Sequence, residues 1–139
     1  LVRRASRMLV AGAALRVPLV AVILRRGYGL GAQAMAGGSL HEPVLTVAWP
    51  GAHLGPMGLE GAVRLGMRKE LEAIADDAER EQRVAAATAA AQDNAKALNA
   101  AMLFEIDDVI DPAETRGVIA ATLAAARTGD WRARFVDTW

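Results

Sequence analysis

The stretch PLVAVILRRGYGLGAQAMAGG, residues 18–38, constrains the fold more than any other part of this chain. Its first seven residues are apolar and rich in β-branched side chains, a pattern typical of a strand that is buried on both faces. Two arginines and a glycine interrupt the run, and the chain then turns from Tyr28 to Ala32. Gln33 to Ala36 can begin a helix. The sequence therefore predicts a buried strand, a glycine turn and a helix start.

A glycine turn of this kind directs several backbone N–H groups into one small space. The first N–H groups of a helix have no internal partner, and the helix dipole is positive there, so the space favours negative charge. Such a turn can bind a phosphate or stabilise an oxyanion. The alternative is a plain connection in which glycine supplies the φ angles. A dinucleotide motif is not supported, because Ala34 stands where G-x-G-x-x-G needs its third glycine.

The rest of the chain contains helical periodicity, capping residues and one further strand pattern. Val44–Trp49 is apolar and bounded by prolines, and it is expected to pair in parallel with the first strand. Asp76 and Asp77 are N-cap candidates. The other expected elements are a helix over 1–15, a loop over 50–58, a helix over 59–74, a helix from 76 to about 101, a short strand or extended turn over 104–110, a helix from Pro112 to about Arg127 ended by Gly129, and an ordered tail over 131–139.

Composition bounds the class of protein. With 139 residues, 53% hydrophobic and only 4% aromatic, the chain is expected to form one helix-rich domain whose core is made of small side chains. The net charge of zero gives no electrostatic footprint for nucleic acid or an anionic membrane. No apolar run approaches the ~20 residues that a membrane span needs. The absence of cysteine excludes disulfides and a thiol nucleophile, and it fits a reducing, cytoplasmic compartment.

Three aspartates, Asp107, Asp108 and Asp111, stand together before the last expected helix. Carboxylates bind hard cations, but a metal site needs more converging oxygens than this group offers. Asp111 directly precedes Pro112, the pattern of an acidic N-cap with proline at the first helical position. We interpret the group as a capped and solvated helix entry, and we predict no metal site.

The histidines and the paired arginines are weaker candidates for chemistry. His41 and His53 fall in expected loops and have no serine–histidine–acid arrangement around them, so surface positions are expected. Arg25 and Arg26 follow the first strand at the mouth of the glycine turn. Two interpretations of the arginines remain open: they hold an anionic substrate, or they mark where the strand meets water.

The order of four blocks is much more specific than any one motif. They are VPLVAVILRRGYGLGAQAMAGGS, VAWPGAHLGPMGLEGAVRL, RKELEAI and KALNAAMLFEIDDVIDPAETRGVI. In this order they resemble the carboxyl-terminal part of the carboxyltransferase (β) subunits of biotin-dependent acyl-CoA carboxylases, the acetyl-CoA and propionyl-CoA carboxylases among them. The resemblance covers nearly the whole chain.

The resemblance implies a crotonase/ClpP-like ββα spiral, a helix-rich α/β fold of which residues 1–139 form a partial, carboxyl-terminal segment. It implies an enzyme of fatty acid metabolism, a ligase or transferase, that moves CO₂ from carboxybiotin to the α-carbon of an acyl-CoA. The implied partners are a biotin carboxylase or biotin carrier subunit, which holds the biotin, and further carboxyltransferase subunits in an oligomer. The chain also lacks an initiator methionine. We expect it to begin inside a longer subunit and to hold half of an active site.

The resemblance also assigns residues. Backbone N–H groups of the glycine turn are implied to form the oxyanion hole for biotin. Many family members read Tyr-Gly-Gly-Ala-Tyr-Asp at this turn. Leu30 departs from that pattern and leaves open which amide faces the hole, and Gln33 replaces an acidic residue associated with acyl-chain choice. The implied site residues are Gly29, Leu30, Gly31 and Ala32 for catalysis, and Tyr28, Gln33 and Gly58 for substrate binding.

Two other functions remain open. One is a crotonase-type hydratase, isomerase or decarboxylase that acts without biotin. The other is a fragment that only packs against partner subunits through small apolar helix faces, which predicts oligomers or aggregation on sizing.

Overall fold

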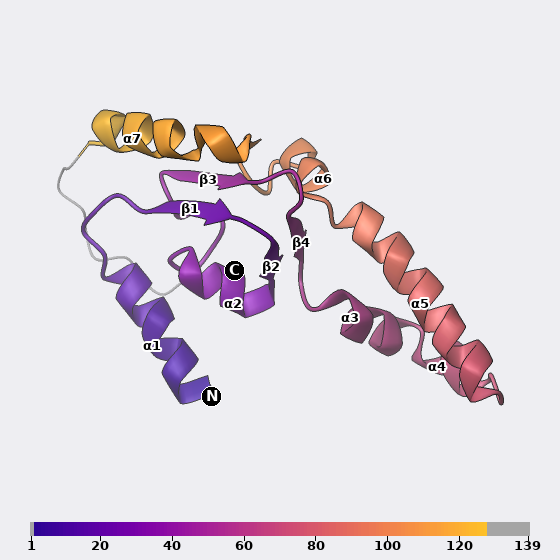
Figure 1. Cartoon of the computed structure of the whole chain (residues 1–139). Coiled ribbons are helices and arrows are strands. Elements are labelled where there is room, and N and C mark those ends of the chain that lie inside the picture. Colours follow the sequence, from indigo (N-terminus) through magenta and orange to yellow (C-terminus); the bar gives the residue numbers. More distant parts are fainter. Residues whose placement is uncertain (1, 128–139) are drawn as a thin grey trace.

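Two successive ββα units form the centre of the fold in the computed structural model, which describes residues 2–127 (Figure 1). Each unit consists of two short strands and the helix that follows them. The first unit is β1 (Val20–Ile23), β2 (Arg26–Tyr28) and α2 (Gly29–Met35), and the second is β3 (Leu45–Ala48), β4 (His53–Gly55) and α3 (Leu59–Gly66). This repetition is the pattern expected of a ββα spiral.

The strands of the two units pair in parallel, element by element. β1 lies beside β3 with Val20 opposite Leu45, and β2 lies beside β4 with Tyr28 opposite Gly55. A third strand, β5 (Asp108–Val109), adds to the other edge of β3, also in parallel. The expected parallel pairing of the two strands is thereby confirmed, and α2 is the crossover helix for both pairs. The burial expected of the first strand is only partly realised, because Ile23 is the one buried residue of β1.

The sequence did not predict β2 and β4. Each strand is only three residues long, and both lie in stretches interpreted as a turn or a loop. Their partners sit in the other ββα unit, so local sequence carries little of the signal that forms them. His53 accordingly lies in a strand and is partly buried, which corrects its expected surface position, whereas His41 is exposed in a turn as expected.

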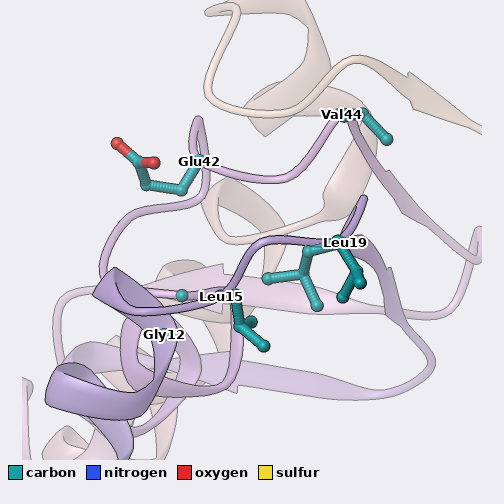
Figure 2. Close-up of a pocket in the computed structure, with 7 residues that line it drawn as sticks. Gly12, Leu15, Leu19, Glu42 and Val44 are labelled. Atoms are coloured by element: carbon teal, nitrogen blue, oxygen red, sulfur yellow. The ribbon is translucent and has the colours of Figure 1, made fainter. Parts of the chain in front are cut away.

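The expected amino-terminal helix is confirmed as α1 (Val2–Ala13), which packs against α2 and the turn that follows it. A Cβ atom on Gly12 would lie 2.7 Å from Cα of Gly37, so only glycine permits this approach of the two backbones. Leu15, Leu19 and Val44 help to line a cavity of ≈ 30 Å³ beside the contact (Figure 2). That volume suits about one water molecule, so the cavity is a packing defect rather than a ligand site.

The buried core is built largely from alanine, as the composition predicts. Its largest cluster surrounds the points where β3, β4 and the segment after α5 meet, and four of its seven members are alanines. Such a core buries little apolar area per residue. Backbone hydrogen bonds between segments therefore contribute more to fixing how the segments are arranged. The cluster comprises Ile23, Ala48, Ala52, Leu54, Ala97, Ala100 and Ile106.

The helix expected over 59–74 is interrupted. α3 ends at Gly66, Met67 leaves helical geometry with φ −97° and ψ 16°, and α4 (Arg68–Glu72) follows in a new direction. The guanidinium group of Arg80 donates to the carbonyls of Leu71 and Ile74 at 3.0 Å and 2.6 Å. These bonds satisfy carbonyl groups at the carboxyl end of α4 and tie it to the next helix.

The long alanine-rich helix is also shorter than expected. α5 (Asp77–Asn94) begins at the predicted cap, where the Asp76 carboxylate accepts a hydrogen bond from the Glu79 N–H at 3.1 Å. It ends before Lys96, because residues 95–97 pair with the outer edge of β4: Leu54 N–H donates to the Ala95 carbonyl and Ala97 N–H to the Ala52 carbonyl. A separate helix, α6 (Ala97–Met102), follows.

Figure 1 shows α5 projecting away from the sheets, with α3 beside it. Much of the alanine run on α5 remains exposed, so the close helix packing expected for its small-residue face is only partly realised within the described residues. Among its polar groups, the buried hydroxyl of Thr88 has no hydrogen-bond partner in the structure.

The last helix is confirmed with a modified start. Asp111 accepts a hydrogen bond from Ala113 N–H at 2.7 Å, as expected of the cap, but the first turn is a 3₁₀ helix, η1 (Pro112–Glu114), before α7 (Thr115–Ala125). Gly129 and the expected ordered tail over 131–139 lie outside the described residues. Within residues 2–127, no helix has the length and apolar character needed to cross a membrane.

An ion pair between Arg64 and Glu81 joins α3 to α5, with Nη2 and Oε2 2.8 Å apart. Hydrogen bonds from Arg64 lower the pKa of the Glu81 carboxyl. A carboxyl whose pKa is lower in the folded state stabilises folding above its unfolded pKa, and this contribution is lost as the pH falls through the folded value. We expect the pairing of α3 with α5 to weaken below about pH 4.

Hydrogen exchange of α3 and α5 amides between about pH 7 and pH 3 checks this expectation. Glu81→Gln should flatten the acid-dependent loss of protection, whereas Glu70→Gln, on exposed α4 and without a side-chain partner among the described residues, should not. Equal pH profiles for the wild type and Glu81→Gln would contradict it.

Candidate functional site

The glycine turn borders an open depression of ≈ 730 Å³. Its volume is in the range of ligand pockets, about 300–1,000 Å³. Four segments form the depression together with the start of α2: β2, the end of β4, the turn after α2 and the loop after α6. The lining residues are Gly27, Gly29, Leu30, Ala32, Gln33, Ser39, Leu40, His41, Leu54, Gly55, Pro56 and Glu105.

Gly29 holds the most constrained backbone position in the depression. Its φ angle is +57°, a left-handed value that side chains with a Cβ rarely adopt. A Cβ atom on Gly29 would also lie 2.7 Å from the Pro56 carbonyl oxygen. Glycine is therefore needed twice at this residue, for its φ angle and for the close approach of the chain after β4.

The structure corrects the extent of the turn. The helix begins at Gly29 rather than at Gln33, so residues 29–32 form the first turn of α2. Tyr28 is the N-cap in extended geometry and gives no side-chain hydrogen bond to the helix. Because α-helical N–H groups donate to the carbonyl four residues back, the amides of Gly29, Leu30 and Gly31 have no acceptor within the helix. The N–H of Ala32 has the Tyr28 carbonyl as its expected acceptor.

The predicted site residues divide into two groups. Gly29, Leu30, Ala32 and Gln33 all line the depression, and the Leu30 side chain is 68% exposed. Three predicted residues are not among the lining residues: Tyr28 is half-buried at the end of β2, Gly31 faces open space, and Gly58 is the exposed N-cap of α3. Their assigned roles remain predictions.

The sequence does not predict the residues that line the depression opposite α2. Pro56 falls in an expected loop, and no sequence motif includes Ser39 as a site residue. Glu105 falls in the segment that is expected to be either a short strand or an extended turn. These residues come together only through the pairing of β4 with β2 and of β5 with β3. A local sequence signal for them is therefore absent.

The remaining candidates lie outside the depression. Arg25 and Arg26 are exposed and are not among its lining residues, so the geometry favours their interpretation as the point where the strand meets water. Asp107 and Asp111 accept backbone hydrogen bonds from Thr46 and Ala113. No group of three or more histidine and acidic side chains over residues 2–127 is arranged to hold a metal ion.

Two ββα units with parallel strand pairs, and a depression at the crossover helix, define an α/β protein of the crotonase-like class. The chain belongs to the Carboxyl transferase domain family, which it matches over residues 1–135. The resemblance drawn from the four sequence blocks is thereby confirmed.

Individual relatives agree. The chain is 37% identical over 128 residues to the methylmalonyl-CoA carboxyltransferase 12S subunit of Propionibacterium freudenreichii subsp. shermanii, covering 88% of this chain and 23% of that protein. It is similar to a single-chain, multi-domain long-chain acyl-CoA carboxylase, with 55% identity and a TM-score of 0.76 over 87% of this chain and 12% of that one.

The crystal structure of the transcarboxylase 12S hexamer with methylmalonyl-coenzyme A and methylmalonic acid bound gives a TM-score of 0.74 at 32% identity. The match covers 91% of this chain and 24% of that one. The crotonase-like fold is confirmed, and this chain spans about a quarter of the length of the curated relatives it matches, 23% in the first of them.

Proposed function

We propose that this chain is the carboxyl-terminal segment of the carboxyltransferase component of an acyl-CoA carboxylase. The proposal rests on the family match over residues 1–135, combined with the position of the first turn of α2 in the depression. Relatives with the names acyl-CoA carboxylase and carboxyltransferase support the reaction class, transfer of CO₂ from carboxybiotin to the α-carbon of an acyl-CoA. We place this reaction in cytoplasmic fatty acid metabolism.

The residues present fit a biotin ring in chemical terms. Leu30 is exposed and Leu40 is half-buried, and both offer apolar surface for a bicyclic ring system. Bound carboxybiotin supplies the CO₂. The amides of Gly29 and Leu30 are donors without helical acceptors, which suits the charge on a ureido oxygen.

The chain's own residues then have distinct roles in the proposal. The amides of Gly29–Gly31 bind the oxyanion, and the Ala32 side chain forms part of the wall. Gln33 carries a neutral amide into the depression, where it can contact either reactant. Tyr28 supports the turn from β2, and Gly58 leaves room at the start of α3 for the acyl-CoA.

Assembly with other subunits belongs to the same proposal. Large apolar side chains on and after α6 are exposed, among them Met102 at 70%, Leu103 at 71% and Phe104 at 84%. Monomers rarely expose apolar side chains in such a group. Hexamer assembly is described for the transcarboxylase 12S relative. We propose further carboxyltransferase subunits and a biotin carboxylase or carrier subunit as the partners.

The test uses the full subunit that contains this chain, together with its biotinylated partner. We expect ATP-dependent transfer of bicarbonate-derived label into an acyl-CoA. The 55% identity to a long-chain acyl-CoA carboxylase makes a long-chain acyl-CoA the first substrate to compare with acetyl-CoA and propionyl-CoA. Absence of labelling across the series would refute the proposal, and conversion that persists without the biotin carrier would favour a hydratase, isomerase or decarboxylase.

A further inference from the structure

Glu105 carries the one carboxylate among the residues that line the depression, and His41 is the other titratable side chain there. Over residues 2–127, the Glu105 carboxylate has no hydrogen-bond or ion-pair partner. Sixteen acidic residues are distributed over the chain, and most that form ion pairs do so on α3, α4 and α5. An unpaired carboxylate beside an apolar depression is available to a ligand.

The backbone on both sides of Glu105 is fixed. Its N–H donates to the Ala100 carbonyl at 2.9 Å, while Phe104 N–H donates to the Ala101 carbonyl at 3.0 Å. These two bonds form a Schellman motif that ends α6. The next residue, Ile106, is 3% exposed and belongs to the core cluster. Glu105 therefore has a defined position although its side chain is exposed.

Phe104, the residue before Glu105, has an unusual backbone conformation. It has a φ angle of 59°, and it is the one non-glycine residue with positive φ in the described chain. Glycine is the usual residue at this point of a Schellman motif, because a Cβ is strained there. The Phe104 ring is 84% exposed, so packing within the described residues does not compensate the strain. Strained residues of this kind cluster at binding sites and interfaces.

With Glu105 included, the depression carries both hydrogen-bond donors and a hydrogen-bond acceptor, which together complement a ureido ring. The amides at the start of α2 that have no acceptor within the helix can only donate hydrogen bonds, and an ionised carboxylate can only accept them. A ureido ring has a carbonyl oxygen that accepts and N–H groups that donate, and one N–H remains when the other nitrogen is carboxylated. One depression thus offers both kinds of partner that such a ring needs.

We propose that Glu105 binds the biotin ring by accepting a hydrogen bond from its ureido N–H. This inference rests on the proposed function, which places the ureido oxygen at the amides of α2. Glu105 is then a binding residue for the biotin side of the reaction and has no direct role toward the acyl-CoA.

The test measures binding of biocytin, the biotinyl-lysine conjugate, to the full subunit by isothermal titration calorimetry. Three variants are compared with the wild type: Glu105→Ala, Glu105→Gln and Glu70→Ala, which removes another exposed carboxylate, on α4. We expect Glu105→Ala to weaken biocytin binding about tenfold, the range of a hydrogen bond to a charged group. Glu105→Gln keeps an acceptor oxygen and should recover most of the affinity, and Glu70→Ala should match the wild type.

Steady-state kinetics gives the second readout. Glu105→Ala should raise the KM for biocytin and leave the KM for acyl-CoA unchanged. Wild-type affinity for biocytin in Glu105→Ala, or a raised KM for acyl-CoA alone, would overturn the assignment of Glu105 while leaving the proposed function intact. A wild-type subunit that neither binds biocytin nor transfers CO₂ to acyl-CoA would overturn both. Thermal unfolding of each variant identifies any loss of folding. If Glu105→Ala does not fold, the biocytin affinity of Glu105→Gln is compared with that of the wild type, and a loss of more than about tenfold would contradict the assignment.

Discussion

Replacing Gly29 by alanine should abolish most of the biotin-dependent activity and destabilise the fold at the same time. The added Cβ would meet the Pro56 carbonyl oxygen at 2.7 Å, and the residue would have to keep a φ angle of +57°. Left-handed backbone and overpacking each cost about 1–3 kcal/mol. Displacement of an oxyanion donor typically lowers kcat by about 100–1,000-fold. We therefore expect a loss of activity of at least about 100-fold.

Gly31→Ala is the matched control for the effect of this substitution on stability. It introduces the same methyl group two residues later in the same helix, where no heavy atom lies within 4 Å of the new Cβ. Alanine is favoured over glycine in helices by about 0.5–1 kcal/mol, so stability should be maintained or slightly raised. Denaturant unfolding and CO₂ transfer are measured on both variants. Equal stability of Gly29→Ala and Gly31→Ala would show that the contact with Pro56 is unimportant.

Replacing Asp107 by alanine should produce the second large effect, on stability. The Asp107 carboxylate accepts a hydrogen bond from the Thr46 N–H at 2.7 Å, and Asp107 N–H donates to the Thr46 carbonyl at 2.8 Å. Thr46 is 1% exposed, so removal of the carboxylate leaves a buried N–H without an acceptor. Such a group costs about 1–3 kcal/mol. We expect Asp107→Ala to lower the free energy of unfolding by about 2 kcal/mol.

Two variants isolate this hydrogen bond. Asp107→Asn keeps a carbonyl oxygen that can accept from Thr46, and it should recover more than half of the loss. Asp108→Ala removes a neighbouring carboxylate whose one hydrogen bond within residues 2–127 comes from the adjacent Val109 N–H, so it should change stability by less than about 0.5 kcal/mol. Urea unfolding gives the comparison. If Asp107→Ala is no less stable than Asp108→Ala, the carboxylate does not hold β3 in place.

Local signals explain the elements that the sequence could predict. β1 and β3 are apolar runs bounded by proline or charge, and the caps at Asp76 and Asp111 depend on the few residues that follow each of them. The break before Lys96 could not be predicted in this way. Residues 85–101 have good helix propensity, and the helix stops because the edge of β4 offers hydrogen bonds to residues 95–97.

The same distinction applies to the site. The α2 side of the depression could be predicted, since glycines after a buried strand indicate an N–H-rich turn without knowledge of the rest of the fold. The resemblance to the carboxyltransferase family supplied the ligand that such a turn would take. Pro56, Ser39 and Glu105 could not be found, because their neighbourhood is created by pairing between strands far apart in the sequence.

The arrangement of the strand pairs also implies that the two walls of the depression form at different stages of folding. Both parallel pairs that position α2 are drawn from residues 20–55, so closing them costs little loop entropy. The loop that carries Glu105 is placed by β5 and by the bond between Thr46 and Asp107, which are 61 residues apart. Contacts of high sequence separation form more slowly. A partly folded chain is therefore expected to present the amide-bearing wall first and to acquire the carboxylate-bearing wall as the pairing of β3 with β5 completes.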